Sequence, residues 1–325
     1  MNILIPDVIK DNGAIEKEIF GSEYNISAPN VTDSNHISDK EWAECDAILA
    51  FDQIIYDSSL IKKLSKCKII VRVGVGFDNV DLDTAQKNGI VVCNVPDYGT
   101  EEVADHTMAL LLGLTRGISE YTNRTQKRNW SRSNDLPIRL RGKNLGLIGF
   151  GRIGMAVALR AKAFGINVSF YDPHLANGFE KSLGVSRFSS LEALAENSNI
   201  LSLHAPLTEE TNNIIGHKIF SVVNKGTLLI NTARGSLIDI DALFSAMKKD
   251  VIKAAALDVL PTEPNIDSQK LITAWENKEE WIRNRLIVTP HVAFYSPESY
   301  TEMRVSAAKE AMRVLNGEIA LNRII

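Results

Sequence analysis

Residues 144–172, which read NLGLIGFGRIGMAVALRAKAFGINVSFYD, decide the fold. An apolar run at 145–148 predicts a buried strand, and the Ala-rich segment after the glycines has apolar residues at helical spacing. A second apolar run at 168–171 predicts another strand, which ends on Asp172. This order of strand, glycine turn, helix, strand and acid is typical of the βαβ unit that binds a dinucleotide.

The glycine turn at 149–154 has the composition that a pyrophosphate requires. Gly149 permits a sharp turn off the strand, and Gly151 has no side chain to block the approach of a phosphate. The helix N-terminus that follows offers unpaired N–H groups and a partial positive charge. The expected cofactor contacts in this turn are Gly149, Phe150, Gly151, Arg152, Ile153 and Gly154.

Asp172 follows the glycine turn at close to the ~20-residue spacing of the acid that binds the ribose 2′-hydroxyl. A carboxylate at this position would repel a 2′-phosphate. The sequence therefore favours NAD over NADP as the cofactor.

The composition excludes several other classes of protein. The 325 residues are 45% hydrophobic and 23% charged, which is typical of a soluble globular protein of two domains. A net charge of −4 without a basic block argues against nucleic-acid and membrane partners. The widely spaced Cys45, Cys67 and Cys93 form neither a disulfide framework nor a metal motif. We expect no metal, no secretory leader and a cytoplasmic location.

The rest of the chain alternates strand-like and helix-like segments. We predict strands at 1–5, 47–51, 68–73, 90–93, 200–203, 227–231, 254–257 and 286–289. We predict helices at 58–66, 101–119 and 297–316, and one that Asp83 caps and that ends near Gly89. Residues 122–143 are strongly basic and indicate an exposed arm, and we assign no element to 21–41. The alternation predicts an α/β fold with parallel sheets.

Three polar residues follow strands at the edge where α/β sheets bind ligands. Arg234 could bind a substrate carboxylate through its planar guanidinium. His291 could exchange a proton with a hydroxyl or carbonyl oxygen near neutral pH, and Glu263 could orient that imidazole. Each residue alone could be structural, but together they predict a hydride-transfer site for hydroxy and keto acids.

Over essentially its whole length the chain resembles the D-isomer-specific 2-hydroxyacid dehydrogenase family. The matching stretches are VRVGVGFDNVD (71–81), NVPDYGTEEVADHTMALLL (94–112), GFGRIG (149–154), LHAPLT (203–208), NTARGSLID (231–239), AALDVLPTEP (255–264) and TPHVAFYS (289–296). Within the family the chain is most similar to the C-terminal-binding-protein branch, through RAKAFGINVSFYDP (160–173) and AFYSPESYTEM (293–303).

The resemblance implies a role for each candidate residue. Arg234, Glu263 and His291 match the family's catalytic trio, Asp258 the acid that meets the nicotinamide carboxamide, and Asp172 the adenosine-ribose ligand. The implied substrate-binding residues are Arg72, Val75, Gly76, Phe51, Phe294 and Met303. The further implied cofactor contacts are Thr107, Ala205, Pro206, Thr211, Thr232 and Ala233, together with Arg234 and His291.

The resemblance also implies the domain organisation and the reaction. A discontinuous, flavodoxin-like substrate domain would comprise 1–98 and 296–325, and a Rossmann domain that binds NAD would comprise 99–295. The helix at 101–119 would form part of a homodimer interface. The implied reaction is reversible hydride transfer between NADH and a small 2-keto acid, which gives a D-2-hydroxy acid.

Other functions fit the residues less well. A D-3-phosphoglycerate dehydrogenase would place arginines in the loop after an early strand, but residues 51–55 read FDQII. An NAD(H)-sensing corepressor would not require the intact trio. A formate dehydrogenase would have Gln in place of Glu263.

Overall fold

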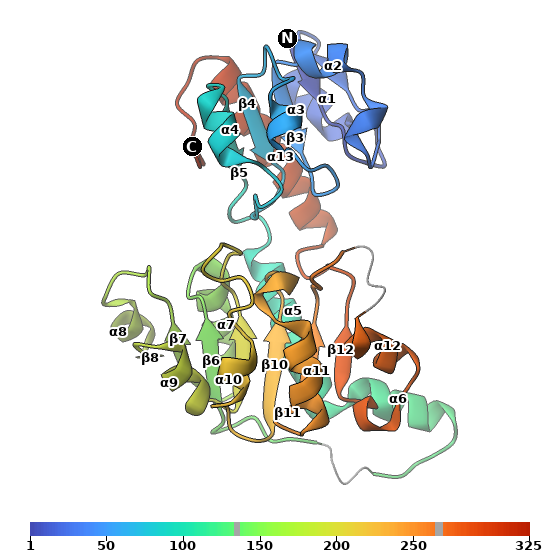
Figure 1. Cartoon of the computed structure of the whole chain (residues 1–325), viewed down its shortest axis with the longest axis vertical. Helices are drawn as coiled ribbons and strands as arrows, with labels where there is room; N and C mark the ends of the chain where they lie inside the picture. The colour runs from blue at the N-terminus through green and yellow to red at the C-terminus, as the bar shows by residue number, and fades with distance from the viewer. Residues whose placement is uncertain (133–136, 264–268) are drawn as a thin grey trace. The chain divides into compact units, whose positions relative to one another are not determined.

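The computed structural model describes residues 1–132, 137–263 and 269–325 and divides into two compact units (Figure 1). The first unit combines Met1–Gly99 with Tyr295–Ile325, and the second is Thr100–Phe294. Each unit is built on a parallel sheet with helices, which confirms the predicted α/β fold class. Within the described ranges, no helix combines the length and the apolar character needed to cross a bilayer.

The first unit has five parallel strands in the flavodoxin-like order β2-β1-β3-β4-β5. The strands are β1 (Asn2–Leu4), β2 (Asn25–Ser27), β3 (Ala47–Ala50), β4 (Ile69–Arg72) and β5 (Val91–Asn94). The helices are α1 (Ala14–Phe20), α2 (Asp39–Glu44), α3 (Ser58–Ile61), α4 (Leu82–Lys87) and α13 (Pro297–Leu315), with a 3-10 turn η1 (Ser34–His36). All four residues of β3 are buried, as a central strand covered on both faces requires.

Two helix boundaries in this unit differ from the prediction. The helix predicted at 58–66 ends at Ile61. The N-cap of α4 is Asp81 rather than Asp83, because the extended backbone of Asp81 lets its carboxylate accept the N–H of Thr84 at 3.0 Å. The unassigned region 21–41 contributes β2, η1 and the start of α2.

The second unit has seven parallel strands in the order β12-β11-β10-β9-β6-β7-β8. The strands are β6 (Asn144–Ile148), β7 (Asn167–Tyr171), β8 (Ser186–Arg187), β9 (Ile200–Leu203), β10 (Thr227–Asn231), β11 (Ile252–Leu257) and β12 (Leu286–Val288). The helices are α5 (Thr100–Arg116), α6 (Ile118–Gln126), α7 (Arg152–Ala163), α8 (Phe179–Leu183), α9 (Leu191–Glu196), α10 (His217–Phe220), α11 (Ile240–Lys248) and α12 (Lys270–Glu276), with 3-10 turns η2 (Gly235–Leu237) and η3 (Glu280–Ile282). One apolar core lies under α5 and α7 and a second under α9 to α12, so this sheet is covered on both faces (Figure 1).

The long helix predicted at 101–119 is two helices. Gly117 adopts φ +62 between α5 and α6, and this left-handed conformation ends the first helix. The basic arm predicted at 122–143 begins inside α6. Residues 133–136 of that arm lie outside the described residues.

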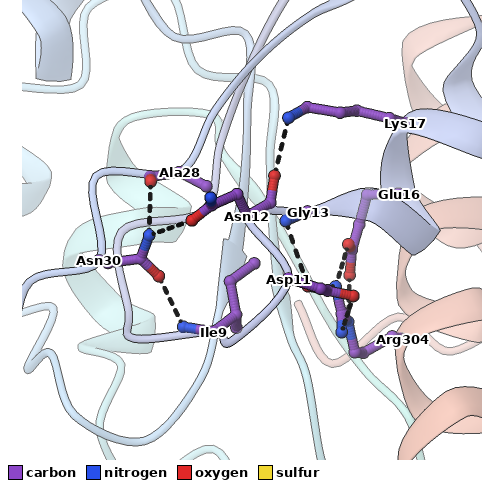
Figure 2. Close-up of polar contacts among 9 residues, drawn as sticks. All are labelled: Ile9, Asp11, Asn12, Gly13, Glu16, Lys17, Ala28, Asn30 and Arg304. Atoms are coloured by element: carbon purple, nitrogen blue, oxygen red, sulfur yellow. Dashed lines mark hydrogen bonds and ion pairs between the residues drawn. The ribbon is translucent and has the colours of Figure 1, made fainter.

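An ion cluster joins α13 to α1 and to the loop before α1. Arg304 on α13 binds Glu16 on α1 in a bidentate pair, with Nε 2.7 Å from Oε1 and Nη2 2.5 Å from Oε2. Its Nη1 and Nη2 also bind Asp11 at 2.9 and 2.8 Å (Figure 2). Burial alone would lower the pKa of Arg304, but the hydrogen bonds that its guanidinium donates to Glu16 and Asp11 outweigh burial and raise that pKa. The same hydrogen bond with Arg304 lowers the pKa of Asp11.

Figure 2 also shows how the loop before α1 is held on its other side. The carboxamide of Asn30 accepts the N–H of Ile9 at 2.8 Å and donates to Asn12 and Ala28. The loop at 9–13 is therefore fixed from both ends, by Asn30 and by the ion cluster.

Candidate functional site

The glycine turn of the second unit leaves an open surface at the start of α7. Gly149 adopts φ +86, and a Cβ there would lie 2.6 Å from the backbone nitrogen of Ala205. A Cβ at Gly151 would meet no atom within 4 Å. The turn thus packs closely on one side and leaves room beside the unpaired N–H groups of α7, as a pyrophosphate requires.

Asp172 is bonded to the glycine turn. Its Oδ2 accepts the N–H of Phe150 at 2.9 Å, and its Oδ1 accepts those of His174 and Leu175 at 3.0 and 3.1 Å. The carboxylate is therefore fixed beside residues 149–154. An open phosphate site and an adjacent acid fit the two ends of an adenosine diphosphate group, so these residues fit NAD.

Two threonines predicted to contact the cofactor contact each other. Thr107 on α5 and Thr232 after β10 are both buried, and their hydroxyl oxygens lie 2.9 Å apart. Thr211 instead closes its own loop, because its hydroxyl donates to the carbonyl of Pro206 at 2.7 Å. Ala233 donates its N–H to Asn231 at 3.0 Å.

The three predicted catalytic residues follow three neighbouring strands. Arg234 follows β10, Glu263 follows β11 and His291 follows β12, and these strands are adjacent in the sheet. Nδ1 of His291 lies 2.6 Å from Oε2 of Glu263, and Oε1 of Glu263 accepts the N–H of Leu260 at 2.5 Å. The side chains of His291 and Glu263 are 36% and 31% exposed, so a substrate can reach the imidazole.

The loop of Arg234 packs against the loop that carries Glu263. A Cβ at Gly235 would overlap the backbone of Leu260, so only glycine permits this approach. The side chain of Asn231 donates to the carbonyl of Arg234 at 2.8 Å, and the guanidinium of Arg234 donates to Ala233 at 2.8 Å. The loops after β10 and β11 are thus held together.

His291 has an unusual backbone. Its φ of +51 lies in the left-handed region, which is uncommon for a residue other than glycine. The buried Asp258 holds this turn: its carbonyl accepts the N–H of His291 at 2.8 Å, and its carboxylate accepts those of Val292 and Ala293 at 3.0 and 2.9 Å. Asp258, predicted to meet the cofactor, therefore also holds the loop that carries His291. The ring of Phe294 packs edge-on against His291 with centroids 6.2 Å apart.

The first unit holds the other predicted substrate residues. Arg72 ends β4 and donates to the carbonyl of Val73, and Val75 and Gly76 lie in the loop that follows. Asn94 fixes that loop by donating to the carbonyl of Val75 at 2.7 Å.

Phe51 and Met303 are both buried. The ring of Phe51 lies 6.5 Å from that of Tyr300, between centroids. The buried Asp7, which sequence reasoning missed, accepts the N–H groups of Phe51 and Gln53 at 3.1 and 2.9 Å. Burial raises the pKa of Asp7. The signal was present, because Asp7 lies three residues after the end of β1, on the side of the sheet where ligands bind.

Two histidines of the second unit were also missed. His106 on α5 places Nε2 3.1 Å from the hydroxyl oxygen of Thr289. His204, directly after β9, is partly buried, with Nε2 2.8 Å from the hydroxyl oxygen of Ser202, and burial lowers its pKa to about 3.

Residues 108–293 match the family model described as D-isomer specific 2-hydroxyacid dehydrogenase, NAD binding domain. D-3-phosphoglycerate dehydrogenase of Methanocaldococcus jannaschii is 38% identical over 263 residues, 81% of this chain and 48% of that protein. The enzyme of the same name from Bacillus subtilis is 33% identical over 315 residues, 97% of this chain and 57% of that protein. Among solved structures, D-lactate dehydrogenase from Aquifex aeolicus, complexed with NAD and lactic acid, is similar with a TM-score of 0.87 and 30% identity, covering 99% of both chains.

The chain therefore belongs to the D-isomer specific 2-hydroxyacid dehydrogenase family, as the sequence motifs predict. Residues 108–293, within the second unit, form its NAD-binding domain. The chain spans about half the length of the curated relatives it matches.

Proposed function

We propose that this member of the family catalyses reversible hydride transfer between NADH and a small 2-keto acid, with a D-2-hydroxy acid as the product. The observation that carries the proposal is the 2.6 Å contact between His291 and Glu263. An accessible imidazole held by a carboxylate is the arrangement that general acid–base catalysis needs.

His291 is the proposed proton donor. Glu263 occupies Nδ1, which leaves Nε2 to face the substrate oxygen. In the reduction direction, His291 gives its proton to the carbonyl oxygen as the hydride arrives at the carbonyl carbon. Before this transfer, the carboxylate of Glu263 stabilises the protonated imidazole. It also orients the ring throughout the reaction.

Arg234 is the proposed anchor of the substrate carboxylate. A guanidinium can bind a carboxylate through two parallel hydrogen bonds, which fixes the orientation of the keto group. Arg72 and the backbone N–H groups of Val75 and Gly76 are the further candidates for this role.

NADH supplies the hydride when it is bound. The start of α7 and Asp172 are proposed to hold its pyrophosphate and adenosine ribose, as their geometry permits. A carboxylate at Asp172 favours NADH over NADPH, because it would repel a 2′-phosphate.

The proposed substrate is a small or moderately apolar 2-keto acid. Residues 51–55 contain Asp52 and no arginine, and Phe51 and Phe294 are aromatic. The second candidate is 3-phosphoglycerate, which the names of the two curated relatives favour.

We further propose a cytoplasmic homodimer in which α6 and α7 contribute to the interface. Ile118 on α6, Leu159 on α7 and Phe164 directly after α7 are 61%, 58% and 44% exposed, and exposed apolar groups favour association. Light scattering should then give twice the 35.9 kDa of one chain. A single-chain mass at assay concentration would contradict this part of the proposal.

An NADH-consumption screen tests the proposed function. The substrates are glyoxylate, hydroxypyruvate, pyruvate, longer 2-keto acids and phosphohydroxypyruvate, each with NADH and with NADPH. We expect turnover of an unphosphorylated keto acid with NADH. A dominant preference for phosphohydroxypyruvate would assign the second candidate, and dominant use of NADPH would contradict the role of Asp172.

A further inference from the structure

His106 lies against the loop that carries His291, although the two are far apart in sequence. It projects from α5, and its Nε2 lies 3.1 Å from Oγ1 of Thr289 and 3.6 Å from Oδ1 of Asp258. Its side chain is 24% exposed, and that of Asp258 is 1% exposed. The contact therefore lies at the edge of the proposed active site and not on the open surface.

The donor and the acceptor can be assigned in each hydrogen bond of the Thr289 hydroxyl. The Thr289 hydroxyl donates its only proton to Oδ1 of Asp258 at 2.6 Å. Its oxygen can then only accept, so the N–H at Nε2 of His106 is the donor. The result is a chain of hydrogen bonds from His106 through Thr289 to Asp258.

Asp258 is the residue that holds His291 in its left-handed conformation. Its carboxylate accepts the N–H groups of Val292 and Ala293, which directly follow His291. A left-handed backbone conformation at a residue other than glycine is strained and persists only where its surroundings hold it. A donor that restrains Thr289 also restrains this carboxylate, and with it the direction of the His291 ring.

The next residue of the same helix reaches a second loop of the proposed site. Thr107 contacts Thr232, which lies two residues before Arg234. One turn of α5 therefore touches both the loop of Arg234 and the loop of His291.

We propose that His106 is a positioning residue that acts through Thr289 and Asp258 to orient His291. The inference rests on the proposed function, because it assigns a task to a residue beside the same acid–base group. His106 itself takes no part in the proton transfer.

Two pairs of variants test the proposal, with kcat measured on the best keto acid of the screen. His106→Leu removes the donor, whereas His106→Gln keeps a side-chain N–H. We expect His106→Leu to lower kcat on the order of tenfold, because small misplacements of reacting groups are costly, and His106→Gln to recover most of it. The dissociation constant of NADH should stay within about twofold, since the cofactor turn is unchanged.

Thr289→Val and Thr289→Ser form the second pair, which serves also if His106→Leu fails to fold. We expect a loss of kcat in Thr289→Val and retention in Thr289→Ser. The double variant His106→Leu, Thr289→Val should be no slower than the slower single variant, because both break the same chain. His217→Leu, on the exposed side of α10, is the matched control and should keep full activity.

Several outcomes overturn the proposal. Full activity in His106→Leu, equal losses in His106→Leu and His106→Gln, or losses that multiply in the double variant would each do so. If the wild-type chain reduces 2-keto acids and His291→Ala does not, the proposed function stands whatever these variants show. If the wild-type chain reduces none, both proposals fail together.

Discussion

The molecule contains two pairs of a nitrogen base with a carboxylate, of almost equal length but in very different surroundings. In the first unit Nη2 of Arg304 lies 2.5 Å from Oε2 of Glu16, and in the second Nδ1 of His291 lies 2.6 Å from Oε2 of Glu263. The side chains are 2% and 1% exposed in the first pair, and 36% and 31% exposed in the second. The two pairs therefore differ in burial and not in the distance between nitrogen and oxygen.

The comparison teaches what each pair can do. Removing Arg304 and Glu16 from water offsets much of their attraction, and what remains fixes α13 against α1. His291 keeps contact with solvent, and its second ring nitrogen is available to a substrate. We infer that the buried pair serves the fold and that the exposed pair serves chemistry.

The largest expected effect is a loss of stability in a variant that breaks the buried pair of Arg304 and Glu16. Glu16→Gln leaves the charge of Arg304 buried with only Asp11 to compensate it, and should lower the free energy of unfolding by about 3–5 kcal/mol. Denaturant titration measures this loss. The kcat of the folded protein should not change.

A double variant and a surface control sharpen this prediction. Arg304→Met combined with Glu16→Leu removes both charges and should be more stable than Arg304→Met alone. Lys63→Met breaks the exposed pair of Lys63 with Asp39 and should cost less than about 1 kcal/mol. Equal losses in Glu16→Gln and Lys63→Met would show that burial does not decide the strength of these pairs.

The next effect concerns the exposed pair. Glu263→Gln removes the charge that holds the imidazole of His291, and should lower kcat by about 10²-fold. The melting temperature should change little, because both side chains are partly exposed. Steady-state kinetics and calorimetry on one preparation separate the two quantities. A stability loss as large as that of Glu16→Gln would erase the contrast between the pairs.

A pH-dependent effect contrasts His291 with the partly buried His204. The pKa of His204 is lowered to about 3 in the folded protein. Between about pH 6.5 and pH 3 this imidazole is therefore protonated in the unfolded chain and neutral in the folded chain. Stability should therefore fall by about 1.4 kcal/mol per pH unit from pH 6.5 down to about pH 3 through this group. In His204→Gln, the plot of unfolding free energy against pH should lose this part of its slope. An unchanged slope would mean that His204 does not stay neutral in the folded protein.

Most of the fold could be predicted from local sequence pattern. The strands at 200–203 and 227–231 begin and end where the apolar runs predict, because buried parallel strands are continuously apolar. The split of the helix at 101–119 was missed, because a glycine inside an apolar run does not reveal the left-handed conformation of Gly117. The short strand β8 carries too few apolar residues to give a pattern.

The candidate site was predictable only in part. Arg234, Glu263 and His291 could be named because each follows a strand and matches a motif. The contacts that hold them could not, since His106 and Thr289 are 183 residues apart and Thr107 and Thr232 are 125 apart. Pairing over such distances depends on strand order, which local pattern does not contain.

The kcat of His291→Ala, measured beside NADH binding and melting temperature on the same sample, tests the central claim most directly. We expect kcat to fall by about 10³–10⁴-fold, because the proton donor is lost, while NADH binding and melting temperature stay near those of the wild type. Near-normal turnover in His291→Ala would contradict the assignment of the exposed pair to catalysis.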